Sequence, residues 1–169
     1  MAVHWITALL MIGMVFFGEE LIEVEDGAAG TLLPSLHVSI GIAILGLTLF
    51  RILWRMINPA PPLPASMAAW EVMASKVTHL LFYAVLIAVP LTGWLAFGEF
   101  VAEEPGMSGV TIFGMFPVPG APSLFGGEAE DIHEIGSKVA MALIILHVLA
   151  ALKHQFISRD GLMKRMSPH

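Results

Sequence analysis

The chain has 169 residues, of which 57% are hydrophobic and only 13% are charged, and its formal net charge is −6. A soluble domain averages about 45–50% apolar and about 25% charged residues, so this composition excludes an ordinary soluble protein and indicates a membrane protein of one domain. The absence of cysteine excludes disulfides, iron–sulfur clusters, zinc–thiolate sites and covalent c-type haem attachment.

The first apolar run covers residues 2–18 and has His4 near its start. It lacks the basic beginning and the small-residue cleavage site of a secretory signal peptide, so we expect a retained membrane span. An acidic stretch at residues 19–26 and a Gly/Ala/Pro linker follow. They lead to the second expected span, residues 36–57, which opens with His37.

Residues 58–64 contain four prolines, which cannot continue a helix because proline lacks an N–H donor and clashes with the preceding turn. We therefore expect a stiff connector to the third span, residues 76–97, which carries His79 near its start. Residues 98–131 form a long loop rich in Gly and Pro, with six acidic residues and no Lys or Arg. The last expected span is 132–156, and a basic tail follows it.

These segments predict an all-α fold: an integral membrane four-helix bundle with four transmembrane spans in a single domain, residues 1–169. The acidic residues concentrate in two loops without basic residues, so the positive-inside rule places both termini in the cytoplasm and the acidic loops in a periplasm. The expected location is therefore the bacterial inner membrane. All basic residues except Lys138 lie on the cytoplasmic side: Arg51, Arg55 and Lys76 around the proline connector, and Lys153, Arg159, Lys164 and Arg165 at the end of the last span.

Three histidines of the last span, His133, His147 and His154, share one stripe of the predicted helix. Fourteen residues advance about 1400° and rise about 21 Å along an α-helix, so His133 and His147 point the same way from opposite ends. His154 lies seven residues further on, on nearly the same face. An ionisable group within a membrane span is costly and usually functional, so these imidazoles are expected to have partners.

The other histidines fall at two matching depths. His37 lies at the outer depth with His133, whereas His4 lies at the cytoplasmic depth with His147, and His79 competes for the same place. Two pairs of imidazoles stacked across a four-helix bundle match the axial ligation of two b-type haems. A single mononuclear metal site is excluded, because ligands about 21 Å apart along a helix cannot share one ion.

Other interpretations of single histidines remain open. An intramembrane His can be a helix–helix hydrogen-bond partner, which applies most to His79 and His154. A proton relay along the stripe usually includes buried Asp or Glu, and no acidic residue lies deep in an expected span. Gly41 and Gly136 each follow an outer histidine by three or four residues, which favours haem because a flat porphyrin needs small residues beside it.

Several motifs resemble those of the bacterial cytochrome b561 family. The resemblance covers nearly the whole chain and implies a four-helix, two-haem membrane cytochrome that exchanges electrons with quinone. Its fold also resembles the cytochrome b subunits of membrane-bound hydrogenases and formate dehydrogenases. The motifs are HW at residues 4–5, HVSIGIAIL from His37, RILWR with the proline-rich segment, HLLFYAVLIAVPLTGW from His79, IHE at residues 132–134, HVLAALKH from His147 and RDGLMKRM from Arg159.

The resemblance also implies residue roles. Matched position by position, it makes His4 and His147 the axial ligands of a cytoplasmic-side haem, and His37 and His133 those of a periplasmic-side haem. These are the pairs that depth suggests. The polar, Arg-bearing lead-in that usually precedes HW in the family does not stand before His4.

The quinone is expected near the cytoplasmic interface. His154 matches a position linked to the quinone site in the family, and an imidazole exchanges protons near neutral pH. Lys153 and Arg159 are expected to offer positive charge to the headgroup, and Trp5 an apolar face and an N–H donor. The alternative is that His154 meets only lipid headgroups at the interface.

The leading hypothesis is a di-haem b-type cytochrome that passes electrons between a periplasmic-side donor or acceptor and ubiquinone or menaquinone. If the protein is an enzyme, the resemblance implies a superoxide:quinone oxidoreductase. Superoxide is an anion, however, and only Lys138 near His133 is basic on the outer side, so acidic loops suit a cationic periplasmic electron-transfer protein better. A third hypothesis is a haem-bearing membrane anchor subunit of a hydrogenase-like or dehydrogenase-like complex. No nucleic-acid partner is expected.

Overall fold

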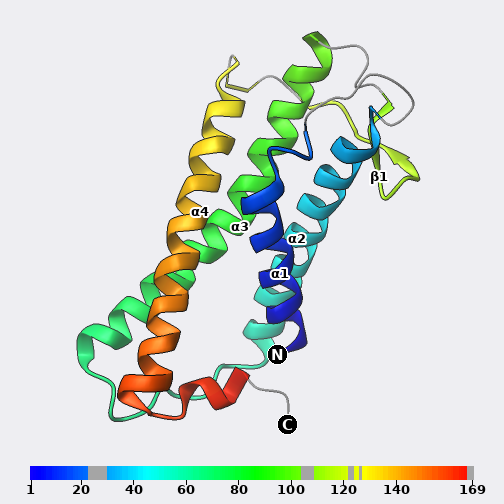
Figure 1. Ribbon diagram of the computed structural model, residues 1–169. Helices are drawn as coiled ribbons and strands as arrows, with labels where there is room; N and C mark the ends of the chain where they lie inside the picture. Colours follow the sequence, from blue (N-terminus) through cyan, green and yellow to red (C-terminus); the bar gives the residue numbers. More distant parts are fainter. Residues whose placement is uncertain (23–29, 104–108, 122–123, 126, 167–169) are drawn as a thin grey trace.

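Four long helices lie side by side in the computed structural model, which describes residues 1–22, 30–103, 109–121, 124–125 and 127–166 (Figure 1). Helices α1 and α3 begin, and α2 and α4 end, at one end of the bundle, called here the lower end as in Figure 1. The opposite end is called the upper end. The helices are α1 (Ala2–Phe17), α2 (Leu32–Ile57), α3 (Ala69–Glu103) and α4 (Ala129–Leu152).

Among the residues that the structure describes, three helical segments are long and apolar enough to cross a membrane: Leu32–Ile57, Ala69–Glu99 and Ala129–Ser158. Helix α1 is apolar but shorter. Large hydrophobic side chains on these helices point outward, which is the distribution expected where lipid rather than water surrounds the protein. The chain is therefore a multi-pass membrane protein.

The last three helices extend beyond their predicted spans, whereas α1 ends at Phe17, one residue before its predicted end. Helix α2 begins at Leu32 rather than at residue 36, and α3 begins at Ala69 rather than at residue 76. Helix α4 continues as a π-helix, η2 (Lys153–Ser158), and a short 3-10 helix, η3 (Leu162–Met166), follows. The fold is mostly helical, as predicted, but the predicted loop 98–131 contains an antiparallel hairpin. Its strands are β1 (Thr111–Ile112) and β2 (Phe116–Pro117).

The core of the bundle takes one buried side chain from each helix. Met11, Ile44, Leu86 and Ala140 form this cluster, near the middle of the helices. Helices α3 and α4 approach closely because Gly136 has no side chain: a Cβ atom there would lie 2.8 Å from Cγ2 of Val89. The cluster therefore holds the four helices together between two levels at which the histidines lie.

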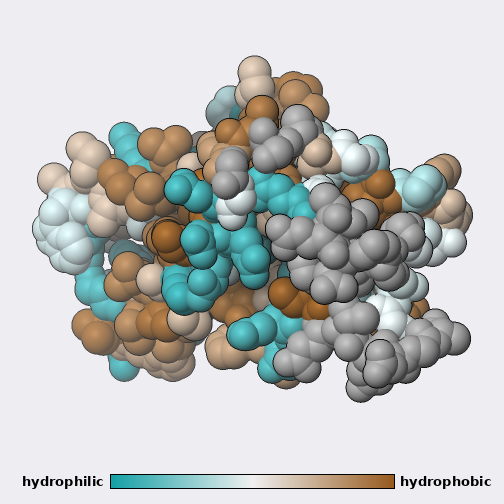
Figure 2. Space-filling model, turned by 90° about the horizontal axis from the view of Figure 1, so that it is seen from above, coloured by the Kyte–Doolittle hydropathy of each residue, from teal (hydrophilic) through white to brown (hydrophobic). Residues whose placement is uncertain are grey.

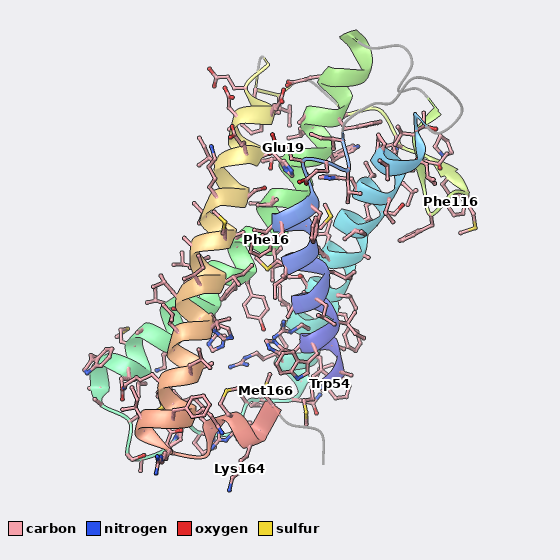
Figure 3. The ribbon with its side chains drawn as sticks, in the orientation of Figure 1. Phe16, Glu19, Trp54, Phe116, Lys164 and Met166 are labelled. Atoms are coloured by element: carbon pink, nitrogen blue, oxygen red, sulfur yellow. The ribbon has the colours of Figure 1, made fainter. Side chains whose placement is uncertain are left out.

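The segment after α4 turns back across the lower end of the bundle. Met166 in η3 accepts a hydrogen bond of 2.9 Å from Trp5 Nε1, and Arg165 donates one of 2.9 Å to the carbonyl of Pro62. Figure 3 labels Met166 and Lys164 on this segment. At the upper end, Figure 2 shows hydrophilic side chains gathered near the centre, with many hydrophobic side chains on the left of the view.

Candidate functional site

The upper level of the bundle holds the predicted outer histidine pair. His37 of α2 and His133 of α4 face each other with ring centroids 6.1 Å apart and ring planes tilted by 54°. Nδ1 of His37 lies 3.0 Å from the carbonyl oxygen of Gly18, and Nδ1 of His133 lies 2.9 Å from that of Val89. A carbonyl only accepts, so each Nδ1 carries the proton and each Nε2 is left as a lone-pair ligand.

The separation of this pair fits two ligands on one metal. A metal–nitrogen bond to imidazole is about 2.0–2.1 Å and the ring centre lies about 1 Å behind the nitrogen, so two imidazoles on opposite sides of one iron have centroids about 6 Å apart. A Cβ atom at Gly13 or Gly41 would meet nothing within 4 Å. The space beside Gly41, one turn from His37, is therefore open for a flat group, whereas Gly136 serves the contact between α3 and α4.

The lower level holds three imidazoles rather than two. The ring centroid of His147 lies 6.3 Å from that of His4 and 6.1 Å from that of His79, with interplanar angles of 62° and 72°. Nδ1 of His79 also lies 3.4 Å from the hydroxyl of Ser75, and Phe82 packs edge-on against His147 at 5.4 Å. Distance alone therefore leaves both His4 and His79 as partners of His147, the same competition that the sequence predicts.

His154 lies on the π-helix η2 and is bound to a residue that the sequence analysis did not single out. Its Nδ1 lies 2.5 Å from Oδ2 of Asp160, and the His154 residue is only 9% exposed. The N–H of Leu162 donates to the other carboxylate oxygen of Asp160 at 3.0 Å. Burial by itself would raise the pKa of Asp160, but the hydrogen bonds from Leu162 and His154 hold it below its ordinary value.

The other predicted quinone residues make separate contacts. Lys153 forms an ion pair with Glu71 of α3 and lies 5.4 Å from the ring centroid of Trp70. The indole N–H of Trp5 donates a hydrogen bond to the carbonyl of Met166. Nε of Arg159 donates to the carbonyl of Phe156 at 3.1 Å. Each of these three side chains therefore contacts another residue of the protein. Among the predicted quinone residues, His154 is the buried one, and its partner is Asp160.

Only Lys138 was expected to be basic on the outer side, and it is paired. Its Nζ lies 2.5 Å from Oε1 of Glu134, and both side chains are more than half exposed. The predicted acidic loops are described in part, because Glu23, Glu25, Asp26 and Glu104 lie outside the described residues. Within the described part, no three His, Asp or Glu side chains are placed so that they could hold one bare metal ion.

Three features of the histidine sites were not predicted from the sequence. The carbonyls of Gly18 and Val89 are backbone groups, and no side-chain pattern marks them as acceptors. Gly93 is a third: a Cβ atom there would lie 2.8–2.9 Å from ring atoms of His133. A signal for Gly93 exists in the sequence, since glycine within a span often marks a close approach between helices.

Comparison with known proteins shows that the chain is similar to cytochromes over nearly its whole length. A family model described as prokaryotic cytochrome b561 matches residues 1–169. Cytochrome b561 homolog 2 of Escherichia coli is 33% identical over 98% of this chain and 87% of its own length. Probable superoxide oxidase CybB of Yersinia pestis is 27% identical over 98% of this chain and 92% of its own. Cytochrome b562 of Cereibacter sphaeroides is 27% identical over 96% of this chain and 89% of its own.

Proposed function

This chain belongs to the prokaryotic cytochrome b561 family, and from that premise we propose that it is a di-haem b-type cytochrome that carries electrons between the periplasmic side and the membrane quinone pool. Membership implies haem b and electron transfer. One observation carries the di-haem proposal. Imidazoles meet at two levels of the bundle with centroids 6.1 Å and 6.3 Å apart, which is the spacing of ligands on opposite sides of one iron.

His37 and His133 would hold the upper haem, and His4 and His147 the lower one. When bound, each haem supplies a one-electron Fe(III)/Fe(II) couple whose potential depends on its axial ligands and its burial. The carbonyls of Gly18 and Val89 fix the tautomer and orientation of the upper imidazoles and increase their basicity as ligands. With two imidazoles assigned to each haem, the groups would serve electron transfer, and substrates would meet the protein at its own side chains instead.

All four helices are proposed to span the inner membrane with the lower end in the cytoplasm. Helix α1 has 16 residues and is about 24 Å long, a little less than the hydrocarbon thickness of about 30 Å. Its lower end carries Trp5, a residue type that is enriched at membrane interfaces. The basic residues at the lower end and the acidic residues at the upper end support this orientation by the positive-inside rule.

The quinone is proposed to exchange its protons with His154. Reduction of a quinone to a quinol takes two electrons and two protons, so a site at the membrane edge needs a group that holds and releases a proton. Asp160 accepts the Nδ1 proton of His154, which leaves Nε2 to receive a proton from a quinol or return it. The π-helix around His154 supports the assignment, because π-helical turns occur frequently at functional sites.

The ion pair between Lys153 and Glu71 changes one expectation about this site. The positive charge of Lys153 is already balanced by the Glu71 carboxylate, and its ammonium group lies over the Trp70 ring. Lys153 therefore attracts a quinone headgroup less strongly than an unpaired lysine would. Arg159 and Trp5 remain candidates at the rim of the site. The buried His154–Asp160 pair is therefore the part of the predicted quinone site on which the proposal depends.

A superoxide:quinone oxidoreductase is the second candidate, because one relative is named as a probable superoxide oxidase. Superoxide is an anion, and steering it requires a basic entrance. Lys138, the one basic residue near His133, is paired with Glu134. The electrostatics of the upper end therefore favour a cationic periplasmic protein as donor or acceptor.

Two measurements test the proposed function. Pyridine haemochrome analysis against protein concentration should give two non-covalent b haems per chain, and a ratio near one or a c-type spectrum would refute it. The purified, reduced protein should then be re-oxidised rapidly by a soluble ubiquinone analogue. Rapid reduction of the oxidised protein by superoxide pulses would instead favour the second candidate.

A further inference from the structure

The β1–β2 hairpin packs on the side of α2 that faces away from the histidines. Ser35 and Ser39 hold it, and each lies two residues from His37, which is about 200° around an α-helix. The N–H of Thr111 donates to Ser35 Oγ at 2.9 Å, and that of Phe113 to Ser39 Oγ at 2.8 Å. Figure 1 shows the hairpin beside the upper part of α2, on the side remote from α4.

The contact with Ser39 places the hairpin well down the helix. Ser39 is seven residues into α2, which is about 10 Å along the axis from its beginning. Helix α2 has 26 residues and is about 39 Å long, against a hydrocarbon layer of about 30 Å. A centred α2 therefore extends only about 4–5 Å beyond the layer at each end, so Ser39 and the hairpin turn lie within it.

The residues at the tip of the hairpin are hydrophobic and exposed. Phe113 is 54% exposed, Met115 is 68% exposed and Phe116 is 60% exposed. Figure 3 shows Phe116 pointing away from the bundle. The sequence around the hairpin, residues 105–127, contains no Asp, Glu, Lys or Arg. This composition contrasts with the acidic residues on either side of it.

The turn keeps an aromatic residue in an unfavourable backbone conformation. Met115 N–H donates to the carbonyl of Ile112 at 3.0 Å, and the two residues between them, Phe113 and Gly114, have φ of 52° and 68°. Turns with positive φ at both central positions favour Asn, Asp and Gly, and a bulky residue there is an outlier. The turn therefore holds the exposed Phe113 side chain at the tip of the hairpin.

We propose that this hairpin is inserted into the lipid of the upper membrane leaflet, where Phe113, Met115 and Phe116 contact acyl chains. Non-helical backbone at this depth requires its polar groups to be satisfied within the protein. The two serines satisfy the amides of Thr111 and Phe113, and the carbonyls of Ile112 and Val110 accept those of Met115 and Val118. Ser35 and Ser39 each donate to a helix carbonyl four residues earlier while accepting an amide of the hairpin.

Lipid fits this surface better than a protein partner does. The tip carries no charge to orient a soluble protein, and it lies on the lipid-facing side of α2 at a depth where lipid surrounds the helix. A groove of about 420 Å³ lies between the hairpin and the first turns of α2, lined by Leu32, Leu36 and Phe113 together with four Ser and Thr residues. An acyl chain can occupy it. The proposal is independent of haem and quinone, so it goes beyond the proposed function.

The absence of native cysteine allows a direct test with single-cysteine variants of the full-length holoprotein. Phe116→Cys and Met115→Cys would carry a nitroxide label in proteoliposomes, and collisions with oxygen and with a water-soluble nickel chelate would be measured by electron paramagnetic resonance. Leu146→Cys, at an exposed position of α4, gives the lipid reference. Glu128→Cys, at the exposed beginning of α4, gives the water reference.

The hairpin labels are expected to match Leu146, with high oxygen and low nickel accessibility. Nickel accessibility equal to that of Glu128 would place the hairpin in water and overturn the proposal. Spin–spin broadening that disappears on dilution with unlabelled protein would show a second copy on this surface, and would also overturn it. Ser39→Ala should raise nickel accessibility at Phe116→Cys, whereas Ser137→Ala, whose hydroxyl bonds its own helix, should not.

Discussion

His147 has two imidazole neighbours at almost the same distance, and helix packing distinguishes between them. His79 belongs to α3, which packs along α4 more extensively than α1 does. A porphyrin between His79 and His147 would have to separate these two helices, whereas α1 and α4 meet over a shorter stretch. This favours His4 as the second ligand, in agreement with the match to the family.

Alanine variants of the three lower histidines test this assignment. His4→Ala and His147→Ala should each lose the lower haem and keep the upper one, so that haem content falls from two per chain to one. His79→Ala should keep both haems, because the proposal makes its ring a neighbour of the ligand His147 rather than a ligand. Loss of the lower haem in His79→Ala together with its retention in His4→Ala would assign the iron to His79.

Gly93 is predicted to be required for the upper histidine pair. A Cβ atom at this position would lie 2.8 Å and 2.9 Å from two ring atoms of His133, so Gly93→Ala must push the imidazole away from Val89. Overpacking of this kind costs about 1–3 kcal/mol, and here it also disturbs a ligand. The expected result is loss or spectral change of the upper haem alone, seen by low-temperature absorption.

Gly46 supplies the matched control for this substitution. A Cβ atom there would meet nothing within 4 Å, and Gly46 lies on the side of α2 opposite His37, nine residues or about 180° away. Gly46→Ala should therefore leave both haems unchanged. Equal effects of the two alanine variants would show that the contact with His133 is not what makes Gly93 necessary.

The segment that ends in η3 is an element held by three contacts rather than by a hydrophobic core. Asp160 binds His154, Arg165 binds the Pro62 carbonyl and Met166 binds Trp5. Asp160→Asn removes the charge from the first contact, so the segment should detach more often. Trypsin should then cleave after Lys164 or Arg165 several-fold faster, measured by mass spectrometry. Glu134→Gln, which breaks an exposed ion pair at the other end, should leave this rate unchanged.

The same carboxylate predicts a pH dependence. The pKa of Asp160 is held below its ordinary value of 3.8 by hydrogen bonds that outweigh its burial. A carboxylate with a lowered pKa stabilises the folded state above its ordinary pKa, and this contribution is lost as the pH falls through the lowered value. Amide exchange at Leu162, corrected for the intrinsic rate, should therefore speed up below the ordinary carboxyl pKa. An unchanged corrected rate down to pH 2 would contradict the assignment.

The sequence predicts the apolar helices well and their ends less well. Hydropathy locates each helix, but Glu71 sets the start of α3 by accepting a hydrogen bond of 2.9 Å from the Ala68 amide, before the apolar run begins. The hairpin was not predicted, because its strands have two residues each and its turn places Phe113 where Asn or Gly is usual. Helical periodicity predicts that His133 and His147 share one face, and depth along the spans pairs them with His37 and His4. The backbone carbonyls that accept from the upper imidazoles depend on packing, so the sequence does not predict them.

At the scale of the whole molecule, charge is divided between the two ends. Among the described residues, the upper end has several acidic side chains and one basic side chain, Lys138, which is paired with Glu134. The lower end carries the remaining basic residues. In the proposed orientation, a reaction partner that approaches from the periplasm therefore meets a negative surface. The upper-end acids whose side chains the structure describes are Glu19, Glu20, Glu99, Glu128, Glu130, Asp131 and Glu134.

This division predicts that cationic reductants deliver electrons to the upper end faster than anionic ones, and that salt removes the difference. Steering by a surface of one sign changes association rates by about 10–10³-fold, and the Debye length shrinks to about 10 Å at 0.1 M salt.

In proteoliposomes in which the C-terminal tail of the protein is protected from external trypsin, the upper end faces outward. There, reduction by hexaammineruthenium(II) should slow as salt rises, and reduction by ascorbate should accelerate. Reversing two charges with Glu128→Lys and Glu130→Lys should weaken both trends without changing haem content. Faster reduction by the anion at low salt would contradict a cationic partner and favour superoxide as the substrate.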